Sequence, residues 1–233
     1  MTLLALDTAS DACSAALSVD GEVLARRIVR PRAHASLLLP MVRSLLEEAG
    51  CGLSALSAIA FGRGPGAFTG LRIAAGVTQG LAFGAGLGVI PVSDLAALAQ
   101  GAIARDGARH VAVAVDARMD EVYWGLYRDR DGLAVEVEPE RVCAPEDARV
   151  PAGPAPVGIG TGWNACGDRL RRACPGMGTV LDAGRLPDAA DMLPLAAAAL
   201  ERGGALPPEQ AVPVYLRDDV ARKRSARGDP AGR

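Results

Sequence analysis

The sequence predicts an α/β fold in which one unit of strands and helices occurs twice, giving two lobes. The runs "LLALD" (Leu3–Asp7) and "HVAVAVD" (His110–Asp116) are both short apolar strands that end in aspartate. Each is followed by an alternating hairpin pattern that turns at an Asp-Gly pair, Asp20-Gly21 in the first unit and Asp131-Gly132 in the second. Helical patterns then alternate with strands, which is typical of sheets covered by helices.

The remaining elements of the first unit follow in order. After the hairpin, a helix over 35–49 carries an apolar stripe, made of Leu38, Met41, Val42 and Leu45. The strand "AIAFG" then leads through a glycine loop into a helix over 70–83. The strand "GVIPV" and a helix over 93–104, capped by Ser93, complete the unit.

The second unit departs from the first after its hairpin. A stretch rich in proline, alanine and glycine, 145–156, stands where the first unit has a helix. The strand "VGIG", the loop "TGWN" with a helix to Ala173, and a last helix from Ala189 to about Arg202 follow. We therefore expect a first lobe over residues 1–107, a second lobe over 108–216, and a basic, flexible tail over 217–233.

Composition narrows the class of protein. Half of the 233 residues are hydrophobic and 22% are charged, as in folded globular proteins. The net charge of -2 gives no global basic field for nucleic acid. Five cysteines without a C-x-x-C pair argue against a disulfide framework or zinc site and for a reducing cytosol, and there is no signal-peptide pattern. We expect a cytoplasmic protein.

An uncharged stretch, Ile73–Ser93, is long enough to cross a bilayer. It contains five glycines and a proline, and glycine clusters of this density break a continuous helix. We expect a helix, a glycine break and a short strand, with no membrane span.

The loop before the second helix permits two interpretations. Its residues include Arg63, Gly64, Pro65, Gly66, Phe68, Thr69 and Arg72. The glycines allow close backbone approach, Pro65 stiffens the turn, and Thr69 is the expected N-cap. The two arginines could help hold an anion at the helix N-terminus. The alternative is a rigid elbow that fixes the helix and displays Phe68.

Three glycines recur on one face of the second helix, Gly76, Gly80 and Gly84, at positions i, i+4 and i+8. Each interior glycine costs up to about 1 kcal/mol relative to alanine. Close approach by another element would compensate for this cost. That element is either the protein's own sheet or a helix of another chain, and spacing alone does not decide between them.

Catalytic signals are sparse. A metal pair on the first helix would need a ligand one turn after His34, and position 38 is leucine. The sequence contains no G-x-S-x-G elbow and no stringent phosphate loop. Only the strand-ending Asp7 and Asp116 could serve phosphotransfer through Mg²⁺. We therefore predict no catalytic, cofactor-binding or metal-binding residues and no cofactor.

Five segments together resemble the bacterial TsaB family, also called YeaZ: "GRGPGAFTGLRI" (62–73), "DARMDEVYW" (116–124), "GTGW" (160–163), "DMLP" (191–194) and "PVYLRDDVARKR" (213–224). The resemblance implies the actin/sugar-kinase/Hsp70-like (ASKHA) fold. It also implies a role in making threonylcarbamoyladenosine in tRNA, on the adenosine beside the anticodon of tRNAs that read codons starting with A.

The resemblance further implies partners. TsaB is similar to TsaD, the subunit that carries the metal and transfers the threonylcarbamoyl group, and the ATPase TsaE joins the pair. The family member is a non-catalytic pseudo-enzyme, homodimeric when alone, that meets tRNA through the complex. The family's interface lies on the first-lobe helices. The residues expected there are Leu38, Met41, Leu45, Gly76, Gly80 and Gly84, with the glycine loop orienting the second helix.

Two other functions compete with this one. An ATP-dependent small-molecule phosphotransferase of the same superfamily would need more than the two aspartates. A protease acting on TsaD would need a nucleophile arrangement that the sequence does not contain. The arginines of the tail, Arg222, Arg224 and Arg227, are either solvated or in contact with tRNA phosphates.

Overall fold

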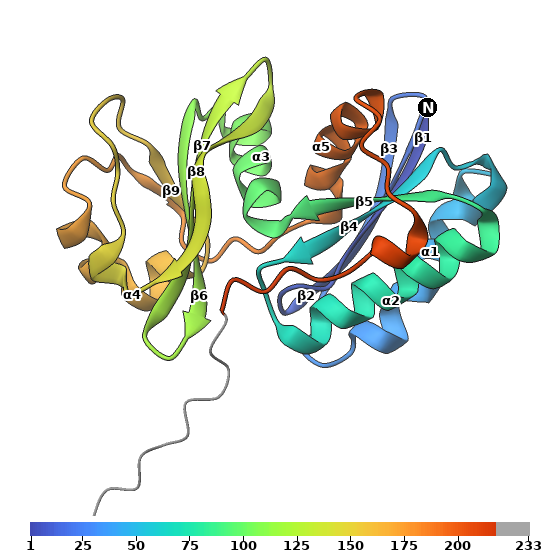
Figure 1. Cartoon of the computed structure of the whole chain (residues 1–233), viewed down its shortest axis with the longest axis horizontal. Helices are drawn as coiled ribbons and strands as arrows, with labels where there is room; N and C mark the ends of the chain where they lie inside the picture. The colour runs from blue at the N-terminus through green and yellow to red at the C-terminus, as the bar shows by residue number, and fades with distance from the viewer. Residues whose placement is uncertain (218–233) are drawn as a thin grey trace, which may run out of the picture.

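The structure, a computed structural model, describes residues 1–217 and places ten strands in two five-stranded sheets within that part of the chain (Figure 1). The first sheet has the order β3-β2-β1-β4-β5 and the second the order β8-β7-β6-β9-β10. The first contains β1 (Thr2–Asp7), β2 (Ala12–Val19), β3 (Glu22–Val29), β4 (Ala58–Gly64) and β5 (Gly88–Ser93). The second contains β6 (His110–Arg118), β7 (Glu121–Arg130), β8 (Leu133–Cys143), β9 (Val157–Ile159) and β10 (Val180–Asp182).

The duplication predicted from the sequence is confirmed by this topology. In each sheet the first strand of the unit pairs antiparallel with the second and parallel with the fourth. Both Asp-Gly pairs turn the hairpins with positive φ, at 49° and 95° for Asp20-Gly21 and at 55° and 83° for Asp131-Gly132. Positive φ at both central residues matches the twist of a two-residue hairpin, which is why this dipeptide predicted the turns.

Five α-helices lie within the described residues: α1 (His34–Glu48), α2 (Phe68–Ala85), α3 (Asp94–Asp106), α4 (Gly162–Ala173) and α5 (Ala189–Glu201). Ser93 caps α3, as predicted, because its hydroxyl accepts from the N–H groups of Leu95 and Ala96. Asp188 caps α5 in the same way. The stretch 145–156 holds only a 3-10 turn, Pro145–Asp147, so the second lobe lacks a counterpart of α1.

The first sheet has helices on both faces. Alternate residues of β1 point to opposite sides, so Leu4 and Leu6 pack with α1 and α2 while Leu3 and Ala5 pack with α5. All four side chains are fully buried or nearly so. This two-sided burial explains why the strand reads as a continuous apolar run.

The packing differs from the predicted lobe limits at two helices. Helix α3 lies in the range predicted for the first lobe, 1–107, but Leu95, Leu98 and Ala102 pack on the second sheet. Helix α5 lies in the range predicted for the second lobe, 108–216, but Met192 packs on the first sheet. Figure 1 shows both helices side by side between the sheets. The last helix of each unit therefore packs on the sheet of the other unit.

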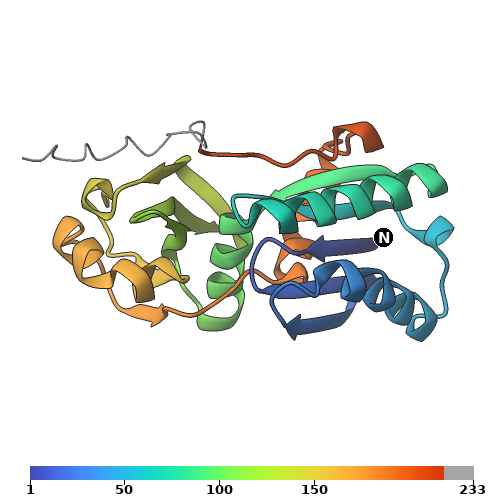
Figure 2. The ribbon, with the colours of Figure 1, turned by 90° about the horizontal axis from the view of Figure 1, so that it is seen from below.

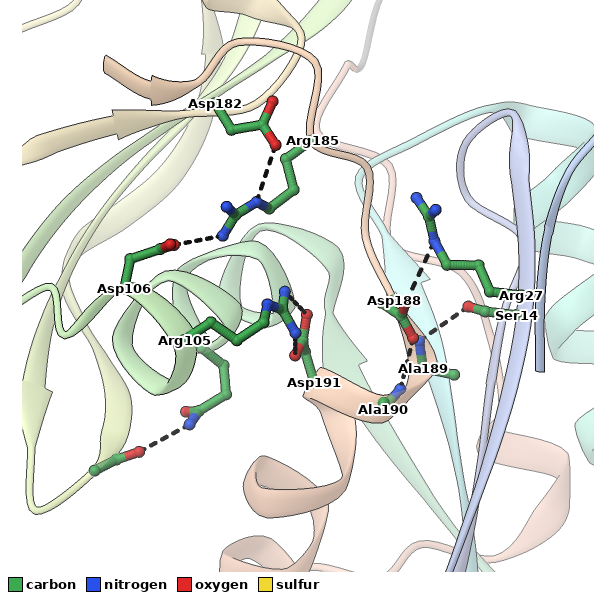
Figure 3. A network of polar contacts seen from close by, with 12 residues as sticks. Ser14, Arg27, Arg105, Asp106, Asp182, Arg185, Asp188, Ala189, Ala190 and Asp191 are labelled. Carbon is green, nitrogen blue, oxygen red and sulfur yellow. Dashed lines mark hydrogen bonds and ion pairs between the residues drawn. The ribbon is translucent and has the colours of Figure 1, made fainter. Parts of the chain in front are cut away.

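Polar contacts hold the two exchanged helices at this crossing (Figure 3). The guanidinium of Arg185 bridges Asp106, at the end of α3, and Asp182, at the end of β10. The Ser14 hydroxyl of the first sheet accepts from the N–H of Ala189, the first residue of α5. The connection between β10 and α5 is thus anchored on both lobes.

The segment after α5 runs along α2 and ends against the second lobe (Figure 2). The Gln79 side chain donates to the carbonyl oxygen of Ala211 at 3.2 Å, and the Val214 N–H donates to that of Arg63 at 2.7 Å. Arg217 then donates to the carbonyl oxygen of Ala117, in β6, at 3.2 Å. The tail predicted over 217–233 lies outside the described residues from position 218 onwards.

Candidate functional site

The glycine loop, residues 62–70, lies directly on the loop that follows β1. A Cβ atom at Gly66 would stand 2.5 Å from the carbonyl oxygen of Ala9, and one at Gly70 would overlap that of Thr8. The Thr8 hydroxyl donates to the Gly70 carbonyl at 2.7 Å, and the Ala67 N–H donates to the Ala9 carbonyl at 2.7 Å. These contacts agree with a rigid elbow that sets the direction of α2.

The N-cap predicted at Thr69 is wrong. Helix α2 begins at Phe68, with Ala67 at the cap position and no side-chain cap bond. The Ala67 N–H donates to the Ala9 carbonyl oxygen, so the chain is held on the loop after β1 at the residue directly before the helix.

The two arginines of the loop face other parts of the protein. The Arg72 guanidinium lies 3.7 Å above the Phe68 ring and donates to the Tyr215 hydroxyl at 3.2 Å. The Arg63 side chain lies 3.9 Å from the carboxylate of Glu140. The Phe68 ring is half exposed, and its centroid lies 5.4 Å from that of the Tyr215 ring, with the two rings tilted by 36°. Both cations therefore already have partners, which gives the anion interpretation no support.

The solvent-facing side of α2 carries all three glycines of the stripe. Gly76, Gly80 and Gly84 are exposed, and a Cβ atom at any of them would meet no atom of the described part of the chain within 4 Å. The buried side of the same helix is formed by Leu71, Ala74 and others. The interpretation that the glycines pack on the protein's own sheet is therefore excluded, and the glycine face is open.

The three apolar residues predicted for an interface on the first helix lie elsewhere. Leu38 and Leu45 are fully buried and Met41 is 6% exposed, all in the core under the first sheet. The prediction that they face a partner is wrong, because the strongest apolar stripe of an amphipathic helix is the one that its own sheet covers.

An open groove of about 700 Å³ lies on the outer side of α1, next to α2. Its lining is mainly apolar and includes Leu39, Pro40, Leu46, Leu53 and Leu81, with Arg43 and Glu47 at its edge. Leu39 is 49% exposed, and Phe83, on α2 beside Gly84, is 81% exposed. We call this groove together with the glycine stripe the α1–α2 face. The groove residues of α1 could not be predicted from the sequence, because exposed leucines do not stand out in an apolar sequence.

A second pocket, of about 350 Å³, lies between the two lobes. It is lined by Ser10, Asp11, Asp116, Tyr123 and Thr161, among others. The Asp116 carboxylate accepts from the backbone N–H of Arg118 and pairs with its guanidinium. Thr161, at the start of α4, accepts from the Asp116 N–H at 3.1 Å.

The other strand-ending aspartate does not reach this pocket. Asp7 has no exposed surface, and one of its oxygens accepts from the Ala9 N–H at 2.7 Å. Burial raises the pKa of Asp7 to about 6. The two aspartates that the duplication aligns are therefore in different environments, and only Asp116 faces the pocket.

His34 begins α1, and its Nε2 lies 2.8 Å from the carbonyl oxygen of Ser10, in the loop after β1. One turn further on is the buried Leu38. Within residues 1–217, no group of three or more His, Cys, Asp or Glu side chains is placed to hold a metal ion. His34 thus serves as a link between the helix and the loop.

Membrane insertion was the other possibility raised by the uncharged stretch 73–93. It forms α2 from Ile73 onwards, a left-handed turn at Gly86 with φ of 67°, and then β5. Over the described part of the chain, no helix is long and apolar enough to span a bilayer.

Two similar five-stranded sheets, each covered by helices and separated by a pocket, define the protein as a two-lobed member of the ASKHA class. A family model described as TsaD: tRNA N6-adenosine threonylcarbamoyltransferase matches residues 25–159. The chain is 45% identical over 230 residues to the tRNA threonylcarbamoyladenosine biosynthesis protein TsaB of Escherichia coli, covering 96% of this chain and 98% of that protein. It belongs to the TsaB (YeaZ) family.

Two further relatives agree. The Haemophilus influenzae protein of the same name is 39% identical over 233 residues, covering 96% of this chain and 97% of that protein. The solved structure of YeaZ from Pseudomonas aeruginosa is 51% identical, with a TM-score of 0.86, and the match covers 92% of this chain and 99% of that one. The family membership therefore extends over both lobes.

Proposed function

We propose that this chain takes part in the biosynthesis of threonylcarbamoyladenosine in tRNA as a non-catalytic partner subunit. The family supports the pathway, because the relatives from E. coli and H. influenzae are named as proteins of this biosynthesis. This chain matches both of them over nearly their whole length. The product is the modified adenosine beside the anticodon in tRNAs that read codons beginning with A.

The proposed partner is TsaD, a homologous subunit, with the ATPase TsaE joining the pair and tRNA met through the assembled complex. On its own the chain forms a homodimer through the same surface. The observation that carries this proposal is the α1–α2 face. A helix that exposes Gly76, Gly80 and Gly84 loses helix propensity at three positions, and no contact with the residues that the structure describes compensates.

A partner helix would supply that compensation. Without side chains on the stripe, two helix backbones can approach closely, and the apolar groove beside α1 offers area to bury. Exposed apolar surface of this kind, rimmed by charged residues such as Arg43 and Glu47, is typical of an interaction site.

The non-catalytic part of the proposal rests on the interlobe pocket. A phosphotransferase of this fold class would need both strand-ending aspartates near a nucleotide's metal ion. Here Asp7 is turned into the protein and Asp116 is paired with Arg118. Asp11, the other carboxyl group that lines the pocket, lies in the loop after β1 and not at the end of a strand.

Co-purification tests the proposal. Tagged chain expressed with TsaD and TsaE should retain TsaD in stoichiometric amount, and the reconstituted set should form the modified nucleoside only when this chain is present. A chain that modifies tRNA alone, or that retains no TsaD while folded, would overturn it.

A further inference from the structure

Two buried carboxyl groups meet beneath the glycine loop. Asp7 ends β1 and Asp94 begins α3, and neither side chain has any exposed surface. Their closeness follows from a third residue, which touches both of them. Gly62 of the glycine loop lies against both, since a Cβ atom there would stand 2.5 Å from Oδ1 of Asp94 and 3.0 Å from Oδ1 of Asp7.

Each carboxyl group of this pair has one oxygen with a hydrogen-bond donor and one oxygen without. Oδ1 of Asp7 accepts from the Ala9 N–H at 2.7 Å, and Oδ2 of Asp94 accepts from the Gly64 N–H at 2.6 Å. The remaining oxygens, Oδ2 of Asp7 and Oδ1 of Asp94, are buried and have no hydrogen-bond donor among the described residues. A buried acceptor without a donor is unfavourable, and a buried carboxylate without one is more so.

We propose that Asp7 and Asp94 share one proton, carried on Oδ1 of Asp94 and donated to Oδ2 of Asp7, and that this protonated pair fixes the glycine loop to β1 and α3. One proton satisfies both orphaned oxygens and removes one of two buried negative charges. Two carboxylates in contact cannot both stay ionised in such a site, as pairs of this kind elsewhere show.

The surrounding charges favour keeping the proton. Burial is the main cause that raises the pKa of both groups. Asp7 raises the pKa of Asp94 further, whereas Asp94 lowers that of Asp7, which fits a proton carried on Asp94. Asp188 at the start of α5 raises the pKa of Asp7, and Glu140 of β8 raises that of Asp94. His34 of α1 acts in the opposite direction on Asp7.

The pair connects the elbow to both lobes. Gly64, whose N–H is held by Asp94, also has φ of 107° and lies on the path into α2. Ser93, the residue before Asp94, contacts Glu140, which in turn contacts Tyr127 of the second sheet. Loss of the shared proton would place a second buried charge under the loop from which α2 starts.

The expected pH dependence follows from the direction of the shift. A carboxyl group whose pKa is higher in the folded state binds its proton more tightly there, so its stabilising effect is complete at low pH and is lost as the pH rises through the folded-state pKa. For Asp7 that loss falls between its ordinary value near 4 and about 6, and the pKa of Asp94 is likewise raised well above its ordinary value.

Isosteric variants of the full chain test the proposal. In Asp94→Asn the amide can donate to Asp7 and still accept from Gly64, and Asp7→Asn can do the reverse. Each single variant should fold and lose part of the alkaline decline in urea midpoint. The double variant turns two amide donors toward each other and should be less stable than the sum of the single changes predicts.

Infrared spectroscopy of the wild type provides a measurement that needs no unfolding. At pH 7.5 the exposed carboxyl groups are ionised, so a protonated carboxyl band should remain, and it should disappear in Asp94→Asn. Absence of that band, or strictly additive effects in the double variant, would overturn the shared proton. None of these outcomes depends on partner binding, so the test is separate from that of the proposed function.

Discussion

Arg105, in the last turn of α3, makes a two-pronged ion pair with Asp191, in the first turn of α5, with N–O distances of 2.6 and 2.8 Å (Figure 3). The Asp191 side chain is 8% exposed and that of Arg105 is 50% exposed. The pair joins the two helices that the lobes exchange. Arg105 and Asp191 are 86 positions apart in the sequence, so the ion pair closes a long loop of the chain.

Removing this cation should destabilise the fold. In Arg105→Ala the nearly buried carboxylate of Asp191 loses both donors, and we expect a loss of about 2 kcal/mol. That is below the roughly 3–5 kcal/mol of a fully buried pair because half of the Arg105 side chain is exposed. Urea unfolding measures it. The control Arg43→Ala breaks an exposed i,i+4 pair with Glu47 and should cost about 0.5 kcal/mol or less. Equal effects of the two variants would contradict a structural role for the crossing.

The glycines of the first lobe should divide into two classes on substitution. Gly62→Ala forces a methyl group against two carboxyl groups and should cost roughly 1–3 kcal/mol. Gly76→Ala meets open space in a helix and should gain up to about 1 kcal/mol. Thermal or urea unfolding of both variants decides it, and a destabilised Gly76→Ala would show that the stripe is covered in the isolated chain.

An exposed carboxylate of the second lobe should titrate unusually low. Two contacts with the Arg169 guanidinium lower the pKa of Glu146 to about 2. Because the folded-state pKa is depressed, this contribution to stability is present above the ordinary value near 4.5 and lost as the pH falls toward 2. Carbon-detected NMR titration measures it directly. In Arg169→Ala the pKa should return toward 4.5, and an unchanged low value would mean that another group causes the shift.

Calorimetry with Mg-ATP should show neither turnover nor tight binding by the isolated chain. The reason is geometric: Asp7 is directed at Asp94 and away from the interlobe pocket. Micromolar binding accompanied by hydrolysis would favour the phosphotransferase interpretation instead.

Local chemistry predicted most of the elements. Both Asp-Gly hairpins, the Ser93 cap and the duplicated sheet could be read from residue types because each depends on a few adjacent positions. The exchange of α3 and α5 could not, since an apolar stripe shows which side of a helix is buried and not which sheet covers it. For the same reason the stripe of Leu38 was assigned to a partner when its own sheet covers it.

The pair of buried carboxyl groups, Asp7 and Asp94, could not be predicted from the sequence for a related reason. Asp94 follows Ser93 at a helix start, where an acidic residue is common for its favourable interaction with the helix dipole. Nothing in that pattern indicates that Asp94 instead accepts from the Gly64 N–H. Nor does it indicate that Asp94 lies beside Asp7, which is far away in the sequence. Only the crossing of β1, the glycine loop and α3 brings these groups together.

The most direct test of the proposed partner role is the affinity of TsaD for the Gly80→Leu variant, measured by titration calorimetry. The variant should stay folded, because a Cβ at Gly80 meets no atom of residues 1–217 within 4 Å. A leucine side chain between two closely packed helices should cost roughly 1–3 kcal/mol of binding free energy, which weakens the affinity by about tenfold to a hundredfold. The control Gly167→Leu, on α4 of the other lobe, should bind within about twofold of the wild type. A folded Gly80→Leu variant that binds TsaD as tightly as the wild type would contradict the assignment of the α1–α2 face.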